Sequence, residues 1–443
     1  MISYSRELRL FSATMSVVGG IIGAGIFVSP AVVAQRVGSG GLTLAVWALG
    51  GLVALAGAFC FAELGARLPR AGGGYVYLRD AFGRLPAFLY GWTLLLVIAT
   101  GATAAVAVTF ARYAIPLLGL PDGAERPLAV GAIVLLAALN YRGVRPAAFM
   151  QNVFTLLKLA ALALVIVAGL SLVPTAPGSR LPAPAGDVGL WGVGLAVGTA
   201  LIPVMFTYGG WQQTNFIAEE IVDAPRTLPR ALVLGVGIVI AVYLLANAAY
   251  LRALGPAGLA ASSAPAADTL EAALGGAGRR VISAGIAVSA FGFLNLVILV
   301  TPRVFQGMAA DGLFFDAVAR LHPRHRTPTA AIAIQAAWAG VLALSGTYAQ
   351  LLDYVVFGDW IFFGAAAATL FVYRARDGGA GAPGFRVPAY RLVAGFFVLA
   401  AVYVVVSAVR AEPANALKGA ALIALGIPVY WYWSRARRQM ADG

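Results

Sequence analysis

Residues 19–30, Gly-Gly-Ile-Ile-Gly-Ala-Gly-Ile-Phe-Val-Ser-Pro, offer binding chemistry through their backbone groups rather than through side chains. Four of the first seven are glycine, inside an apolar segment long enough to span a membrane. Each glycine costs a helix interior roughly 1 kcal/mol relative to alanine, so the cluster predicts an interrupted helix. Backbone N–H and C=O groups that lack helical partners at membrane depth are tolerated only where they are buried in protein or line a cavity. The alternative is close helix packing through Gly19 and Gly23, and this stretch alone leaves both interpretations open.

A second irregular stretch lies near the middle of the chain. Phe206 to Phe216 follows Pro203 and places a glycine pair and a polar run inside another apolar segment. The two stretches fall in the first and sixth apolar segments, at the same place in two successive five-helix units. Interrupted segments at corresponding positions of two halves are the best sequence indication of a secondary transporter's substrate site. The pairing therefore favours a binding cavity over simple helix packing.

Lys158 is the clearest ionisable residue within an apolar segment, because no other residue between Phe149 and Leu172 is charged. A charge at the centre of a membrane helix costs roughly 2.5–3.5 kcal/mol on insertion scales, so such a residue indicates a function. The alternative is that the lysine extends to a membrane interface. Its position, about ten residues into the segment, favours the functional interpretation.

The composition of the 443-residue chain indicates an integral membrane protein. Hydrophobic residues make up 61% and charged residues only 11%, whereas an ordinary soluble domain is about 25% charged. Apolar runs of about 20 residues recur along the chain, as spanning helices require, without the alternation of a β-barrel. We expect an all-α protein of about twelve transmembrane helices, beginning with a retained helix rather than a signal peptide. The expected spans are 11–36, 42–66, 86–113, 127–141, 149–173, 190–217, 231–253, 280–305, 329–346, 351–373, 390–409 and 416–433.

The distribution of the 31 basic residues predicts the topology. With twelve spans, 20 of them fall on the side of the two termini and 9 on the other side. Lys and Arg are in excess in cytoplasmic loops, so both termini are expected in the cytoplasm. The net charge of +13 lies in these loops and indicates no nucleic-acid partner. Cys60 is the only cysteine, which excludes an internal disulfide and a cysteine metal cage.

Four motifs follow one another along the whole chain and carry a family resemblance. The first is 19–30, and the second is 61–78, FAELGARLPRAGGGYVYL. The third is 206–211 with the trailing segments NFIAEE and PRTLP, and the fourth is 385–388, FRVP. Together they resemble the motifs of the amino acid–polyamine–organocation superfamily, and most closely those of its L-type amino acid transporter branch.

This resemblance implies a fold and an activity. The fold is LeuT-like, with two inverted five-helix repeats at about 11–173 and 190–373 and two extra helices at about 390–433. Helices one and six would be unwound at mid-membrane, and the chain would form one transporter domain that needs no cofactor or metal. The implied activity is alternating-access transport of amino acids.

The resemblance also implies how a zwitterionic amino acid binds. Half-helix N-termini leave N–H groups unpaired and half-helix C-termini leave carbonyls unpaired, so a broken helix can bind both charges. Relatives often have serine in place of Ala24. Without that hydroxyl group, recognition of the substrate's carboxylate depends more fully on backbone N–H groups in this chain. The residues implied for the carboxylate are Gly23, Ala24 and Gly25, and those for the ammonium are Ile21, Phe206 and Gly209.

The resemblance also implies which residues surround the rest of the substrate. Phe206 would be a gate, with ordinary apolar packing as the alternative; Trp211 and Gln212 would border the pocket, and Trp360 would contribute from the tenth span. Asp359 departs from close relatives, which commonly have a neutral residue there. One interpretation is a pocket carboxylate, which would favour substrates with cationic or polar side chains or would couple transport to protons. The other is a residue that stabilises a kink in the helix. Both interpretations stay open.

Lys158 has a specific implied role. The L-type branch has a lysine at this point, whose ammonium takes the place of the sodium ion used by sodium-coupled relatives. It would tether span five to spans one and eight, with Ser289 as a partner. We therefore predict sodium-independent transport, with exchange of neutral L-amino acids. The alternatives are a proton-coupled amino acid permease or a permease for cationic amino acids or polyamines of the same superfamily.

Other functional classes fit the sequence less well. A membrane-embedded enzyme needs a nucleophile–base pair or a metal cluster, whereas His322 and His325 lie in a basic loop that favours solvation. A channel would show a pore ring or filter motif, and neither is visible. At the cytoplasmic ends of the spans, Glu220 and Asp223 lie near Arg226, which predicts either gating ion pairs or purely topological charges.

Partners and location can be predicted in part. Animal relatives bind a glycoprotein through a cysteine between spans three and four, and the loop 115–126 has no cysteine, so no disulfide-linked subunit is expected. The composition is rich in Ala, Gly and Arg and poor in Lys, as in bacteria of high GC content, which favours a bacterial inner membrane. The preferred amino acid, the coupling mode and the oligomeric state stay open.

Overall fold

The computed structural model describes residues 3–176, 190–346, 348–377 and 384–442. In these ranges the chain is helical, with short connections and one isolated β-bridge between Leu8 and Ile221. The long helices are α1 (Leu10–Ile21), α2 (Gly25–Val37), α3 (Gly40–Arg67), α5 (Arg84–Thr93) continued by η1 (Leu94–Ile98) and α6 (Ala99–Leu118), α7 (Glu125–Tyr141), α8 (Val144–Val167) continued by η3 (Ala168–Leu172), α9 (Leu190–Tyr208), η4 (Trp211–Glu220), α10 (Ala224–Ala261), α12 (Gly276–Val300), α13 (Pro302–Ala310), α15 (Thr329–Ser345), α16 (Tyr348–Arg376), α17 (Tyr390–Ala411) and α18 (Pro413–Asp442). Four short helices are α4 (Gly74–Phe82), η2 (Asp122–Ala124), α11 (Pro265–Leu274) and α14 (Asp316–Ala319).

Each expected span coincides with one of these helices or with a consecutive set of them. Within the described ranges, eight helices are long and apolar enough to cross a membrane. The pair α1 and α2, bent by 43°, makes a ninth if it forms one span. The all-α membrane architecture is therefore confirmed, while the number twelve and the division into two inverted repeats stay predictions.

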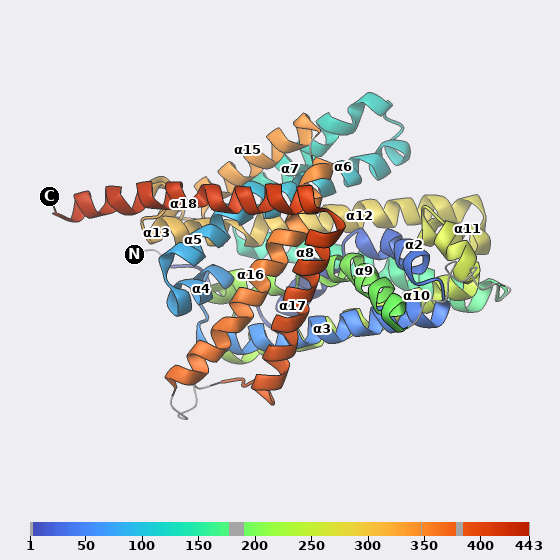
Figure 1. Ribbon diagram of the computed structural model, residues 1–443. Coiled ribbons are helices and arrows are strands. Elements are labelled where there is room, and N and C mark those ends of the chain that lie inside the picture. Colours follow the sequence, from blue (N-terminus) through green and yellow to red (C-terminus); the bar gives the residue numbers. More distant parts are fainter. Residues whose placement is uncertain (1–2, 177–189, 347, 378–383, 443) are drawn as a thin grey trace.

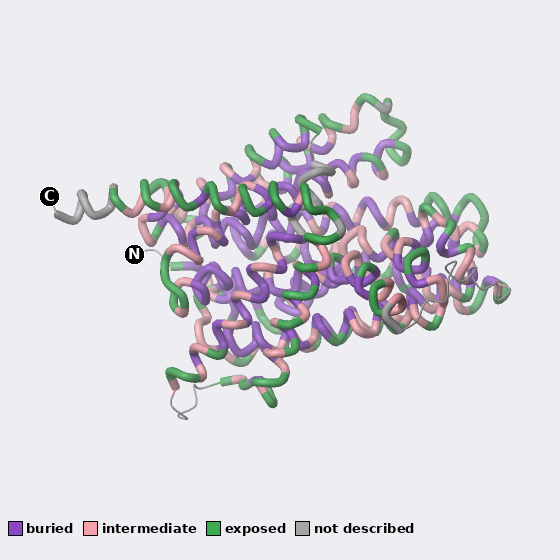
Figure 2. Tube along the Cα trace, viewed as in Figure 1, coloured by how far each residue is buried: buried purple, intermediate pink, exposed green. Residues whose placement is uncertain are grey.

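The helices form one elongated bundle, and the two chain ends lie at the same end of it (Figure 1). α3, α10 and α12 run along the bundle, α16 and α17 cross it obliquely, and α18 lies along one side. Buried positions concentrate on the central helices, whereas much of α18 and the outer pair α7 and α15 is exposed (Figure 2). The central helices therefore position the residues of interest.

Both predicted helix interruptions are visible in the backbone. α1 ends at Ile21, Ile22 is extended, and the chain resumes as α2 from Gly25. α9 ends at Tyr208, and the chain resumes as the 3₁₀ helix η4 from Trp211. The glycine clusters thus end helices that would otherwise cross the bundle without a break.

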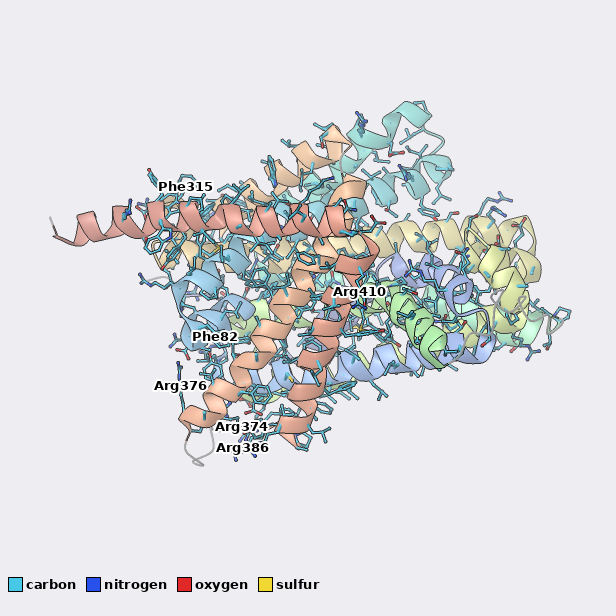
Figure 3. The ribbon with its side chains drawn as sticks, in the orientation of Figure 1. Phe82, Phe315, Arg374, Arg376, Arg386 and Arg410 are labelled. Carbon is cyan, nitrogen blue, oxygen red and sulfur yellow. The ribbon has the colours of Figure 1, made fainter. Side chains whose placement is uncertain are left out.

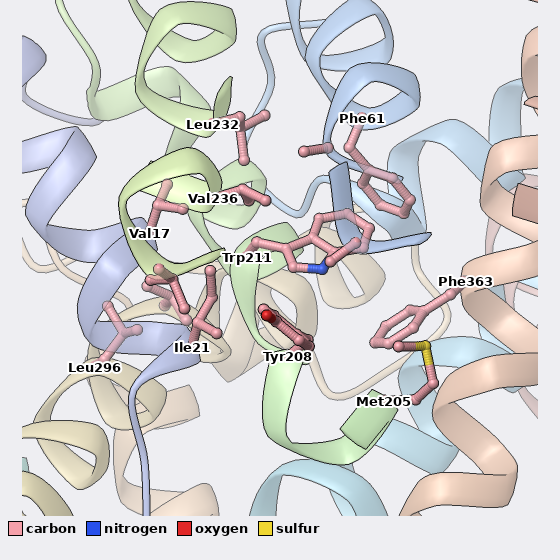
Figure 4. Close-up of a cluster of buried hydrophobic side chains, with 14 of the residues drawn as sticks. Val17, Ile21, Phe61, Met205, Tyr208, Trp211, Leu232, Val236, Leu296 and Phe363 are labelled. Atoms are coloured by element: carbon pink, nitrogen blue, oxygen red, sulfur yellow. The ribbon is translucent and has the colours of Figure 1, made fainter. Parts of the chain in front are cut away.

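The two interruptions touch each other. Gly210 has φ +110°, a conformation that favours glycine, and a Cβ there would lie 2.1 Å from the carbonyl oxygen of Gly20. Apolar side chains pack around this crossing, with Ile21 and Tyr208 on the two helix ends (Figure 4). Glycine at position 210 is therefore required for the breaks to meet.

Candidate functional site

A cavity of about 180 Å³ lies where the two helix breaks meet. Its wall is formed by the breaks themselves and by residues of α5, η1, α6, α12 and α16. Nine of the ten residues predicted to bind substrate line it: Ile21, Gly23, Ala24, Gly25, Phe206, Gly209, Gln212, Asp359 and Trp360. The fold thus brings together residues from three distant parts of the chain.

The first break presents unpaired donors to this cavity. The first N–H groups of a helix have no partner within it, and at the start of α2 only that of Phe27 turns back, to the carbonyl of Ala24 (3.1 Å). The N–H groups of Ala24, Gly25 and Ile26 have no hydrogen-bond partner among the described residues. Together with the positive end of the helix dipole, they form an arrangement that attracts an anion.

The second break presents carbonyl groups. At the end of α9, the carbonyl of Phe206 accepts from the N–H of Gly209 (3.2 Å). Gln212 fixes the next turn, because its Oε1 accepts from the N–H of Gly210 (3.0 Å). The C-terminal end of a helix carries partial negative charge, so this side of the cavity suits a cation.

Tyr243 of α10 connects the two breaks, and the sequence analysis missed it. Its buried hydroxyl lies 3.1 Å from the carbonyl oxygen of Ile21 and 3.3 Å from that of Thr207. The Ile21 carbonyl also accepts from the N–H of Gly23 (2.9 Å). A tyrosine inside an apolar span needs a hydrogen-bond partner for its hydroxyl group. In the sequence, only this requirement indicates that Tyr243 has a specific role.

Lys158 of α8 holds the end of α1. Its side chain is fully buried, and its Nζ donates to the carbonyls of Gly19 and Ile22, each at 2.8 Å. No acidic side chain among the described residues pairs with it, so its charge is balanced by the negative end of the α1 dipole. A lysine buried in this way does not extend to a membrane interface.

Ser289 of α12 lies beside the same helix end. Its Oγ is 3.5 Å from the carbonyl oxygen of Ile22 and 3.3 Å from that of Gly23. Lys158 and Ser289 therefore share the Ile22 carbonyl, and the predicted tether between spans one, five and eight runs through this backbone group.

Phe206 and Trp211, the two aromatic residues predicted near the second break, lie in different environments. Phe206 lines the cavity with 44% of its surface exposed. Trp211 lies behind the wall instead of bordering the pocket, because its ring packs against Phe61, Phe363 and Phe397 (centroids 5.1, 6.0 and 5.9 Å). Figure 4 shows Trp211 among these buried side chains, between Phe61 and Phe363.

Asp359 and Trp360 contribute the α16 side of the cavity. The Asp359 carboxylate has no hydrogen-bond or ion-pair partner among the described residues. Trp360 packs against Phe363 and Phe397. The α6 residues in the cavity wall are apolar except Thr109, among them Ala102 and Val106. Among the described residues that line the cavity, Asp359 is the one with a carboxylate, and most of the lining is apolar.

Largely buried ion pairs connect the C-terminal ends of α3 and α16. Glu63 accepts from Arg67 (2.9 Å), from Arg374 (2.7 Å) and from the N–H of Val387 (2.7 Å). A hydrogen bond from Arg67 (2.7 Å) holds the pKa of Asp377 below its usual range. Arg374, Arg376 and Arg386 gather at this end of α16 (Figure 3).

Glu220 does not pair with the neighbouring arginines that the sequence indicated. It pairs with Arg303 of α13 (2.8 Å), and both side chains are buried. Only Asp223 reaches Arg226, in an exposed pair at 3.8 Å. The cavity lining follows α6 from Ala99 to Thr109. On the side of the Glu220–Arg303 pair, the lining includes Phe216 and Thr301.

Replacing Glu220 by glutamine should destabilise the protein by about 3–5 kcal/mol, because it leaves the Arg303 charge buried without a counter-charge. Thermal unfolding of the purified protein in detergent measures this effect. Asp223→Asn is the matched control, since an exposed pair contributes at most about 1 kcal/mol. Equal melting temperatures for the two variants would show that the buried pair is not structural.

Comparison with known proteins identifies relatives over the whole chain. The family described as amino acid permease matches residues 8–429. The human large neutral amino acids transporter small subunit 2 is 33% identical over 457 residues, which cover 100% of this chain and 83% of the relative. The human Asc-type amino acid transporter 1 is 32% identical over 97% of this chain and 82% of its own length. The cystine/glutamate transporter of Pongo abelii is 30% identical over 97% of this chain and 85% of its own length.

These matches confirm the resemblance to the amino acid–polyamine–organocation superfamily and its L-type branch. The relatives are transporters and not enzymes. The chain, a multi-pass membrane protein, therefore belongs to the amino acid permease family.

Proposed function

We propose that this protein transports neutral L-amino acids across a membrane without sodium, by alternating access and in exchange for another amino acid. The observation that carries the proposal is the shared cavity between two broken helices, one presenting free N–H groups and the other presenting carbonyls. The printed names of two relatives, a large neutral amino acids transporter subunit and an Asc-type amino acid transporter, support this substrate class.

The substrate carboxylate would bind the free N–H groups of Ala24 and Gly25, and that of Gly23 once it leaves the Ile21 carbonyl. The ammonium would bind carbonyls of Ile21, Phe206 and Gly209. Opposite helix ends match the two charges of a zwitterion. The Ile21 carbonyl already accepts from Gly23 and lies within reach of Tyr243, so an ammonium there would displace one of these donors. Phe206, exposed in the cavity, would cover the bound substrate, and Gln212 would border its side chain.

Sodium independence would follow from Lys158. A cation bound between α1 and α8 needs backbone carbonyls as ligands, and the ammonium of Lys158 already occupies those of Gly19 and Ile22. Ser289 would help to hold the Ile22 carbonyl when α1 moves. The fixed charge then performs the structural role of a sodium ion in every transport cycle.

We propose that both termini lie in the cytoplasm and that the membrane is a bacterial inner membrane, as the charge distribution and composition favour. The buried pairs around Glu63 and Glu220 would then form the closed inner gate. The two five-helix repeats would move relative to each other to open it. The only cysteine, Cys60, is buried, which supports the expectation of no disulfide-linked subunit.

Competition with blocked substrates tests how the cavity recognises an amino acid. Uptake of labelled leucine into proteoliposomes should be inhibited by unlabelled leucine, but not by leucine methyl ester or N-acetyl-leucine. Each blocked compound lacks one of the two charges that the helix ends are proposed to bind. Equal inhibition by leucine and by either blocked compound would contradict the proposed binding mode.

Asp359 is proposed to select the side chain of the substrate, because its carboxylate faces the cavity without a protein partner. Asp359→Asn should weaken inhibition by arginine relative to leucine by about tenfold, since hydrogen bonds to charged groups contribute about 1.5–3 kcal/mol. Inhibition of labelled leucine uptake by both amino acids measures this ratio. The exposed Asp316→Asn serves as the control. Identical ratios in wild type and Asp359→Asn would leave Asp359 with a role in the helix kink.

A further inference from the structure

A groove outside the transport cavity runs between α7 and α15, on the outer side of the bundle (Figure 1). It has a volume of about 970 Å³ and is lined by small residues such as Ala138, Ala337 and Gly340. Large apolar side chains of both helices also line it, among them Leu135 and Leu344, which are 62% and 51% exposed. An exposed apolar groove on a membrane protein is suited to a lipid acyl chain.

The end of the groove near the chain termini is basic. Tyr141 and Arg142 at the end of α7 line it together with Thr329 at the start of α15. The turn that leads into α15 packs on Tyr141: the rings of His322 and His325 lie 5.3 and 5.6 Å from its ring. The groove therefore ends at a turn of defined structure rather than at a loose loop.

Three arginines belong to this end of the groove. Arg142 lines it, and Arg324 and Arg326 lie in the turn, which Thr327 fastens by a hydrogen bond to the carbonyl of Tyr141 (3.0 Å). All three are exposed, and none forms an ion pair within the described part of the chain. The neighbouring Arg145, by contrast, pairs with Glu7 (3.0 Å). An anionic group at the groove's end would meet three uncompensated charges.

We propose that this groove is a binding site for an anionic phospholipid. An acyl chain lies along the small residues between α7 and α15, and the phosphate binds Arg142, Arg324 and Arg326. Basic pockets between membrane helices on the cytoplasmic side are suited to such head groups. A second copy of the chain fits less well, because a symmetric pair would bring the two arginine clusters together and like charges repel.

Two sets of variants test the acyl and head-group parts separately. Gly340→Leu places an apolar side chain in the groove, and its Cβ would have no protein atom within 4 Å. Gly131→Leu is the control, because Gly131 lies on α7, a Cβ there also has no atom within 4 Å, and Gly131 does not line the groove. Arg142→Gln/Arg324→Gln/Arg326→Gln removes the charges. Its control is Arg6→Gln/Arg9→Gln/Arg230→Gln, three exposed arginines near the same end.

The purified full-length protein is titrated with phosphatidylglycerol or phosphatidylcholine of the same chain length, and bound lipid is measured by native mass spectrometry. Wild type should bind phosphatidylglycerol on the order of a hundredfold more tightly than phosphatidylcholine, because each of the three basic residues contributes about 1 kcal/mol near a lipid surface. The triple charge variant should lose this preference, Gly340→Leu should bind both lipids less, and both controls should behave as wild type.

Two results would overturn the proposal. One is an unchanged lipid preference in the triple charge variant. The other is unchanged lipid binding in Gly340→Leu; if the same variant also altered the mass of an oligomer, the groove would be an interface between copies of the chain.

Discussion

Lys158→Ala should reduce amino acid uptake to the level of protein-free vesicles. The substitution removes the ammonium that binds Gly19 and Ile22 at 2.8 Å and leaves two buried carbonyls unpaired. Each unpaired buried group costs about 1–3 kcal/mol, and this cost falls on the end of α1 that forms the site. Initial rates of labelled leucine uptake in proteoliposomes measure the effect.

The chain contains a matched control for this experiment. Lys418 is its only other lysine and is exposed on α18, so Lys418→Ala should transport at the wild-type rate. The amount of each reconstituted variant and its melting temperature separate a loss of transport from a loss of folded protein. A wild-type rate in folded Lys158→Ala would exclude the proposed role of the lysine.

Gly210→Ala should also abolish transport, and it should lower the melting temperature as well. A Cβ at this position would lie 2.1 Å from the carbonyl oxygen of Gly20, and φ is +110°. The two breaks would have to move apart, which disrupts the cavity that both of them line. Uptake and thermal unfolding are measured on the same preparation.

Gly194→Ala is the control for Gly210→Ala. It lies in α9, the helix that precedes Gly210, and a Cβ there has no atom within 4 Å. Alanine favours a helix over glycine by about 1 kcal/mol, so this variant should be at least as stable as wild type. Transport by Gly210→Ala at the rate of Gly194→Ala would mean that the contact between the breaks is not needed.

The sequence predicted those parts of the site that depend on local backbone chemistry. Glycine clusters at 19–25 and 209–210 disfavour a continuous helix wherever they occur, so both breaks could be located without tertiary information. Lys158 was equally visible, because an isolated charge inside an apolar span is costly and needs a function. Its partners turned out to be backbone carbonyls of α1.

Residues whose roles depend on tertiary packing could not be predicted in the same way. Tyr243 contacts Ile21, more than 200 positions away along the chain. Glu220 binds the distant Arg303 rather than the nearby Arg226. Trp211 lies behind the cavity wall, because Gly57 of α3 leaves room for its ring: a Cβ there would lie 2.6 Å from it. Sequence spacing does not determine which face of a short 3₁₀ segment meets a cavity.

Uptake of a labelled amino acid panel into proteoliposomes, with sodium replaced by choline, tests the central claim most directly. The vesicles are preloaded with unlabelled leucine or left empty, and a pH gradient is imposed in a parallel series. We predict that neutral amino acids are taken up at the same rate in sodium buffer and in choline buffer. Internal leucine should accelerate this uptake, and the pH gradient should leave its rate unchanged. Uptake that requires sodium, or no uptake of any amino acid by the folded protein, would contradict the account.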